Sequence, residues 1–148
     1  MLLKGYLEFR KAIHDAGLQN GFQWLDGSFM EDIETLESRQ PKDIDVLTFY
    51  HETVGISQLD LMTKSQLLFS FGKTHRDARK AQFGVDSIVS SMSGTPEELI
   101  ERSTYWYSMW AHRRTDLWKG YLQVDLQPIE DQQAKDLLDT LAAKLTTP

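Results

Sequence analysis

The 148-residue sequence contains no cysteine, which excludes disulfide bonds, thiolate zinc sites and a cysteine nucleophile. It has no run of about 18 consecutive apolar residues, so it predicts no membrane-spanning helix and no membrane partner. Basic residues are also few: 16 Lys and Arg stand against 22 Asp and Glu, and this net charge of −6 disfavours a general polyanion binder. Lys4 and Glu8 interrupt the apolar amino terminus, which is atypical of a signal peptide, and we therefore expect a cytoplasmic protein.

The residues that are present have the composition of a globular protein. Hydrophobic residues make up 41% and charged residues 26%, which suits a single domain spanning residues 1–148. Apolar spacing predicts helices over 2–16, 57–82, 95–112 and from 128 onward, and strands over 22–25, 43–50, 83–90 and 119–126. Thr95 and Thr63 are each expected to begin a helix with a capping box. This alternation predicts an α/β (α+β) fold, in which helices cover a small mixed β-sheet of about four strands.

Three aspartates lie at the starts of apolar strands. Asp43 and Asp45 are two residues apart, so their side chains leave the same face of the sheet. Neighbouring carboxylates repel each other unless a cation or a proton lies between them. Asp86 is the only charged residue in the stretch 83–89 and would join them if the two strands are neighbours. Converging carboxylates are hard oxygen ligands of the kind that Mg²⁺ takes; solvated aspartates at strand ends are the alternative.

Gly27 and Ser28 follow a predicted strand, where glycine permits close backbone approach and the next amides could face an anion; a simple turn is the alternative. Fourteen residues then separate Ser28 from Asp43. This order of a strand, Gly-Ser, a spacer, Asp-x-Asp and a later strand aspartate resembles the nucleotidyltransferase superfamily, although the spacer is at the long end of its pattern. The match is carried by Trp24-Leu25-Asp26-Gly27-Ser28-Phe29 and Pro41-Lys42-Asp43-Ile44-Asp45-Val46. More narrowly, the chain is similar to small, stand-alone bacterial proteins of that fold over most of residues 1–126.

The resemblance implies a nucleotidyltransferase fold and Mg²⁺-dependent attack on the α-phosphate of a nucleoside triphosphate, with pyrophosphate as the leaving group. Asp43, Asp45 and Asp86 would be the catalytic carboxylates and would hold one or two Mg²⁺ ions, and Asp86 would also help to deprotonate the nucleophile. Gly27 and Ser28 would bind the triphosphate. The implied acceptor is a protein or a tRNA, in a toxin–antitoxin or phage-defence module.

Other residues could complete such a site. Three basic residues after an aromatic helix could bind phosphates from the opposite wall of a cleft, or be solvated loop charges: Arg113, Arg114 and Lys119. A basic stretch could contact nucleic acid, or be an ordinary helix face: Lys73, His75, Arg76, Arg79 and Lys80. An aromatic cluster could stack a base, or belong to the core or to a partner interface: Tyr105, Trp106, Tyr107 and Trp110.

Two further classes of function stay open. A catalytically inactive member of the same fold would serve as a nucleotide sensor or bind a protein partner, and it would take a triphosphate without releasing pyrophosphate. The acidic surface and the tryptophans suit a protein partner or a homo-oligomer. A metal-dependent nuclease would use the same carboxylates and would need no triphosphate.

Overall fold

The computed structural model describes residues 2–52 and 56–146, and its sheet mixes parallel and antiparallel pairing. Among these residues, four strands form one sheet in the order β3-β2-β1-β4: β1 (Gly21–Asp26), β2 (Ile44–Tyr50), β3 (Val85–Ser91) and β4 (Leu122–Asp125). β2 and β3 run parallel, while β1 is antiparallel to both β2 and β4. The predicted α+β architecture, a small mixed sheet covered by helices, is therefore confirmed.

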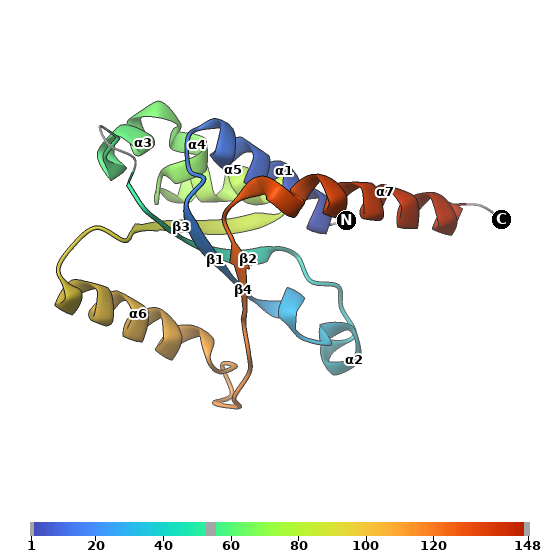
Figure 1. The fold of residues 1–148 in the computed structure, drawn as a ribbon. Helices are drawn as coiled ribbons and strands as arrows, with labels where there is room; N and C mark the ends of the chain where they lie inside the picture. Colours follow the sequence, from blue (N-terminus) through green and yellow to red (C-terminus); the bar gives the residue numbers. More distant parts are fainter. Residues whose placement is uncertain (1, 53–55, 147–148) are drawn as a thin grey trace.

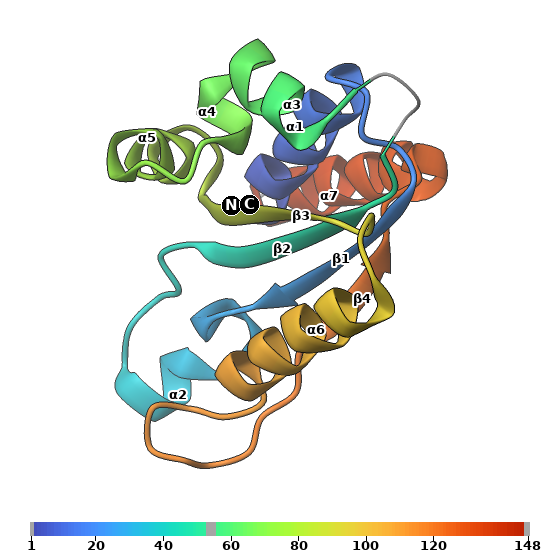
Figure 2. The same cartoon turned by 90° about the vertical axis from the view of Figure 1, so that its left-hand side faces the viewer.

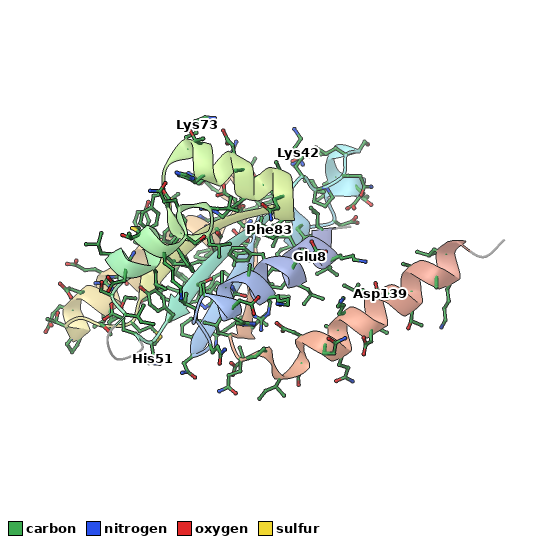
Figure 3. The ribbon with its side chains drawn as sticks, turned by 90° about the horizontal axis from the view of Figure 1, so that it is seen from above. Glu8, Lys42, His51, Lys73, Phe83 and Asp139 are labelled. Atoms are coloured by element: carbon green, nitrogen blue, oxygen red, sulfur yellow. The ribbon has the colours of Figure 1, made fainter. Side chains whose placement is uncertain are left out.

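Most helices lie on one face of the sheet (Figures 1 and 2). This layer contains α1 (Leu2–Asp15), α3 (Gln58–Lys64), α4 (Gln66–Phe69) and α5 (Lys73–Phe83). On the opposite face lies α6 (Pro96–Trp110), and the short α2 (Ile33–Glu37) lies beyond the end of the strands (Figure 2). After the 3₁₀ turn η2 (Pro128–Glu130), α7 (Asp131–Thr146) begins beside α1 and extends away from the sheet, as Figures 1 and 3 show. No helix in the described part of the chain is long and apolar enough to cross a membrane.

The hydrophobic core lies between α1 and the sheet. Phe9 and Ile13 of α1 are fully buried and belong to one cluster with Ile44, Val46 and Val85 of the strands. Because successive side chains of a strand point to opposite faces, the residues between these apolar positions turn toward α6. Asp45 and Asp86 are the first such residues of β2 and β3, which places the predicted acidic residues on the face away from the core.

Local differences from the sequence prediction have simple causes. Residues 30–42 contain α2, where only a turn is expected, because the Asp32 side chain accepts a hydrogen bond from the amide of Thr35 and caps a short helix. The strand expected from residue 83 begins at Val85, since Phe83 still belongs to α5 and Gly84 ends that helix in the left-handed conformation, with φ of 65°.

Of the two expected capping boxes, the structure forms one. Thr95 and Glu98 cap α6 as predicted. Thr63 instead lies inside α3, where its hydroxyl donates to the carbonyl of Leu59. Ser57 and Asp60 form the box that starts α3, so the predicted box was wrong by about two helical turns.

Candidate functional site

A cleft of about 890 Å³ opens between the sheet and α6. One wall comes from the ends of β1, β2 and β3 with the turn after β1. The other wall comes from the last turns of α6 and the segment that follows it. All the residues that the sequence analysis expects to bind metal or triphosphate line this cleft: Gly27, Ser28, Asp43, Asp45, Asp86, Arg113, Arg114 and Lys119. Of the other candidates, Arg76, Trp106 and Trp110 also line it, whereas Lys73, His75, Arg79, Lys80, Tyr105 and Tyr107 do not. The structure thus brings together residues that are up to 92 positions apart, from Gly27 to Lys119.

The register of the sheet gathers the carboxylates. Because β2 and β3 are parallel neighbours, Asp45 lies directly beside Asp86, and Asp43 precedes Asp45 by two residues. One carboxylate oxygen from each of the three residues lies within 4.8 Å of the others. Among the residues that the structure describes, these three aspartates are the one group of acidic, histidine or cysteine side chains that is compact enough to hold a metal ion.

Two basic residues of α5 neutralise part of this group. The Lys80 ammonium lies 2.8 Å from Asp43 Oδ2 and 2.8 Å from Asp86 Oδ2. Arg76 donates two hydrogen bonds to Asp86, at 2.9 Å and 2.6 Å. Burial alone would raise the pKa of Asp86, but the hydrogen bonds from Arg76 and Lys80 outweigh burial and hold this pKa below its usual range.

Asp45 lies between its acidic neighbours, and no ion pair to it occurs among the described residues. Burial is the main reason why its pKa is raised to about 6, and the charges of Asp43 and Asp86 raise it further. Lys80 offsets only part of this effect. Asp45 is therefore the carboxylate at which an additional positive charge would be most favourable.

The turn at Gly27 packs directly against Asp45. Gly27 has φ of 86° and ψ of −171°, a backbone conformation that is essentially restricted to glycine. A Cβ at this position would lie 2.6 Å from Asp45 Oδ2. Ser28 then begins η1 (Ser28–Met30), a 3₁₀ helix of one turn. Ser28 itself is partly exposed and lines the cleft. Gly27 thus packs against the acidic group, and Ser28 lines the same cleft.

Asp26 is a site residue that the sequence analysis missed. It pairs in register with Asp45, so Asp26, Asp45 and Asp86 form one row across β1, β2 and β3. Burial raises the pKa of Asp26, and the Lys119 ammonium at 2.8 Å offsets part of this shift. The available signal was a lone aspartate at the end of an apolar strand, the same feature that singled out Asp86.

The predicted phosphate-binding residues have acidic partners in the cleft. Lys119 pairs with Asp26 and lies 3.6 Å from Glu31, and Arg113 pairs with Glu31 and lies 3.7 Å from Glu37. These ion pairs connect the segment after α6 to the end of β1 and the turn that follows it. Arg114 is exposed at the rim.

The basic stretch of α5 is not an open surface patch. Arg79 is buried and donates to the carbonyls of Leu67, Ser70 and Ser87. Arg76 and Lys80 face the acidic group, and Lys73 pairs with Asp77 on the helix surface. Within this stretch Asp77 offsets one positive charge, and Asp86 and Asp43 outside it pair with Arg76 and Lys80.

Residues 1–125 match a protein family described as a family of unknown function, DUF6932. The match includes the four strands and every residue of the acidic cleft, and it ends before η2 and α7. No curated protein and no solved structure matches the chain. Since the family match spans most of its length, the chain belongs to the DUF6932 family.

Proposed function

We propose that the chain is a Mg²⁺-dependent nucleotidyltransferase that moves a nucleoside monophosphate from a nucleoside triphosphate to a protein or tRNA acceptor. The observation that carries this proposal is the group Asp43, Asp45 and Asp86, with oxygens within 4.8 Å of one another, in the wall of a cleft of about 890 Å³. Such a cleft has the size of a small-molecule site. The Gly-Ser turn against Asp45 and the basic residues of the opposite wall supply the remaining elements.

The chemistry of the donor set fits a hard divalent cation. All three donors are carboxylates. Burial is the main cause of the raised pKa of Asp45, and repulsion by Asp43 and Asp86, which a bound cation relieves, adds to it. The Lys80 ammonium already bridges Asp43 and Asp86, which indicates that this position favours positive charge. In the proposed enzyme the three aspartates hold Mg²⁺, which when bound stabilises the negative charge on the phosphate oxygens.

The residues of the chain have distinct tasks in this proposal. Arg113, Arg114 and Lys119 orient the triphosphate tail from the wall opposite the sheet, with Ser28 at the turn. The acceptor hydroxyl oxygen forms a bond to the α-phosphorus while the bond from that phosphorus to the pyrophosphate oxygen breaks, and the hydroxyl proton passes to a carboxylate. Arg76 and Lys80 lower the pKa of Asp86, so Asp86 is a weaker proton acceptor than the resemblance implies, whereas the pKa of Asp45 is raised to about 6.

Thermal unfolding with Mg²⁺ and each ribonucleoside triphosphate is the first test. A ligand at about 100 times its dissociation constant adds about 2.7 kcal/mol to the free energy of unfolding, which corresponds to a rise in Tm of about 8 °C for a chain of this size. We expect this rise with at least one triphosphate, and we expect Asp43→Asn and Asp45→Asn to abolish it. Asp77→Asn is the matched control, since this exposed carboxylate of α5 pairs with Lys73 outside the cleft.

Transfer itself is then followed with a triphosphate labelled at the α-phosphate, offered with total tRNA or with a protein extract. Label should become macromolecular and pyrophosphate should be released, whereas a γ-phosphate label should not be incorporated. A thermal shift that survives both aspartate substitutions would overturn the assignment of the site.

One observation favours a second candidate, a catalytically inactive nucleotide sensor of the same architecture. Lys80 and Arg76 already satisfy Asp43 and Asp86 in the structure, so a triphosphate could bind without Mg²⁺ being held by all three aspartates. This candidate predicts a thermal shift with a triphosphate that does not need Mg²⁺, and no pyrophosphate release.

A further inference from the structure

The cleft has an acidic wall, which the sheet supplies, and an aromatic wall, which α6 supplies. Trp106, Met109 and Trp110 line the cleft, and their spacing of three and four residues places them on one face of the helix. The two indole rings lie edge to face, with centroids 5.6 Å apart and an angle of 64° between their planes. Both tryptophans are only partly buried, and Met109 is 55% exposed, so this face is available at the cleft rather than enclosed in the core.

The sheet below this face changes from acidic to apolar over a short distance. On β3, Ile88 follows Asp86 by two residues, points to the same face and also lines the cleft. Two residues of a strand span about 7 Å. A ligand that places an anionic group at the carboxylates therefore meets apolar surface about 7 Å further along β3, in the same cleft that the aromatic face lines.

Helix α6 is tied to the rest of the molecule at two points, so the aromatic wall has a defined position. Near the middle of the helix, Arg102 donates to the carbonyl of Ser91 at 2.7 Å, which ties α6 to the end of β3. Beyond its end, Arg113 pairs with Glu31 of the turn after β1. Figure 2 shows the resulting course of α6 across the sheet face that carries the acidic row.

We propose that Trp106 and Trp110 form the nucleobase subsite of this cleft, on which the base of the triphosphate stacks while its phosphates lie at the carboxylates. This inference rests on the proposed function and adds to it the residues that select a base-bearing ligand over a bare polyphosphate. Stacking on an aromatic side chain suits a base because every base has a π face, and it requires only the partial exposure that both indoles have.

The test compares ATP with inorganic tripolyphosphate, which has the phosphate chain but no base, in titration calorimetry with Mg²⁺. Stacking on one aromatic side chain typically changes affinity by roughly tenfold or more. Trp106→Leu should therefore weaken ATP binding by about tenfold and leave tripolyphosphate binding unchanged. Trp118→Leu is the matched control, because Trp118 is 73% exposed and does not line the cleft; it should change neither affinity.

Two further measurements keep the result decisive if Trp106→Leu fails to fold. Trp106→Phe retains an aromatic face and should keep most of the affinity for ATP. In the unmodified protein, ATP but not tripolyphosphate should quench tryptophan fluorescence, and Trp106→Phe should reduce this quenching. Equal binding of ATP and tripolyphosphate, with affinities that Trp106→Leu does not change, would overturn the base subsite and leave the proposed function standing. Binding of neither tripolyphosphate nor any of the four ribonucleoside triphosphates in the presence of Mg²⁺ would overturn both.

Discussion

Gly27 couples the backbone after β1 to the carboxylate of Asp45. Its φ of 86° and ψ of −171° lie in a region of backbone conformation that residues other than glycine rarely adopt. The open side of this glycine faces Asp45 Oδ2, at 2.6 Å from the position of a Cβ. Two features therefore require glycine at position 27: the backbone conformation and the close approach of the Asp45 carboxylate.

We expect Gly27→Ala to lower the free energy of unfolding by about 2 kcal/mol, because alanine is strained in this conformation. Tm should fall by about 6 °C, as measured by scanning calorimetry, and Mg²⁺ should stabilise the variant less because Asp45 must turn away. Gly120→Ala is the matched control, since a Cβ at Gly120 meets nothing within 4 Å. An unchanged Tm in Gly27→Ala would contradict the constraint.

At the scale of elements, α7 is joined to the rest of the molecule through a buried arginine of α1. Arg10 is 1% exposed, and its Nε donates to both carboxylate oxygens of Asp131 at 2.9 Å. Its other nitrogens donate to the side chain of Gln23 and to the carbonyl of Gln127. Further along α7, Leu137 is 59% exposed and Leu145 is 87% exposed, so the polar contacts at the start of α7 are its main buried link to the rest of the molecule.

We expect Asp131→Asn to destabilise the protein by about 2 kcal/mol, because it leaves a buried guanidinium without its anionic partner. This corresponds to a fall in Tm of about 6 °C. Asp139→Asn, about two turns further along α7, removes a half-exposed pair with Lys4 and should cost less than about 0.5 kcal/mol. Equal Tm values for the two variants would show that Arg10 does not need Asp131.

At the scale of the whole molecule, the cleft is where charge opposes folding. Asp26, Asp45 and Asp86 lie side by side across three strands, and Asp43 adds a fourth carboxylate to a chain with a net charge of −6. Basic residues from α5 and from the segment after α6 compensate Asp26, Asp43 and Asp86. Asp45 is left in the middle, and its pKa rises from 3.8 to about 6.

The sign of the resulting pH dependence follows from proton linkage. Because the folded state holds the Asp45 proton more tightly than the unfolded state, ionisation of Asp45 destabilises the fold as pH rises from about 4 to about 6. Without divalent cations, Asp45→Asn should therefore be more stable than the wild type above this range, by about 1–2 kcal/mol after allowance for solvent screening. The difference should vanish near pH 4.

Thermal unfolding of both proteins at a series of pH values, in the presence of a chelator, measures this difference. Added Mg²⁺ should reverse the order at neutral pH, since only the wild type retains the full set of carboxylates. A difference between the two proteins that stays constant with pH would contradict the raised pKa of Asp45.

The sequence by itself determined the elements whose cause is local. Alternation and β-branching predicted the strand at 43–50, Thr95 and Glu98 predicted the start of α6, and Asp43, Asp45 and Asp86 were recognisable as charges in apolar strands. Each of these features depends on residues within a few positions of one another. The sequence did not predict the short helix α2, because its cap is a single aspartate in a polar stretch that is equally typical of a turn.

Only the tertiary structure decided which of these residues meet. The parallel pairing of β2 with β3 aligns Asp45 with Asp86, and the antiparallel pairing of β1 adds Asp26 to the row. The basic stretch of α5 looked like a surface patch in the sequence, yet Arg76 and Lys80 reach the acidic group and Arg79 is buried. Strand register and helix docking are set by packing between residues tens of positions apart, so local patterns specify the ingredients of the cleft and long-range packing assembles it.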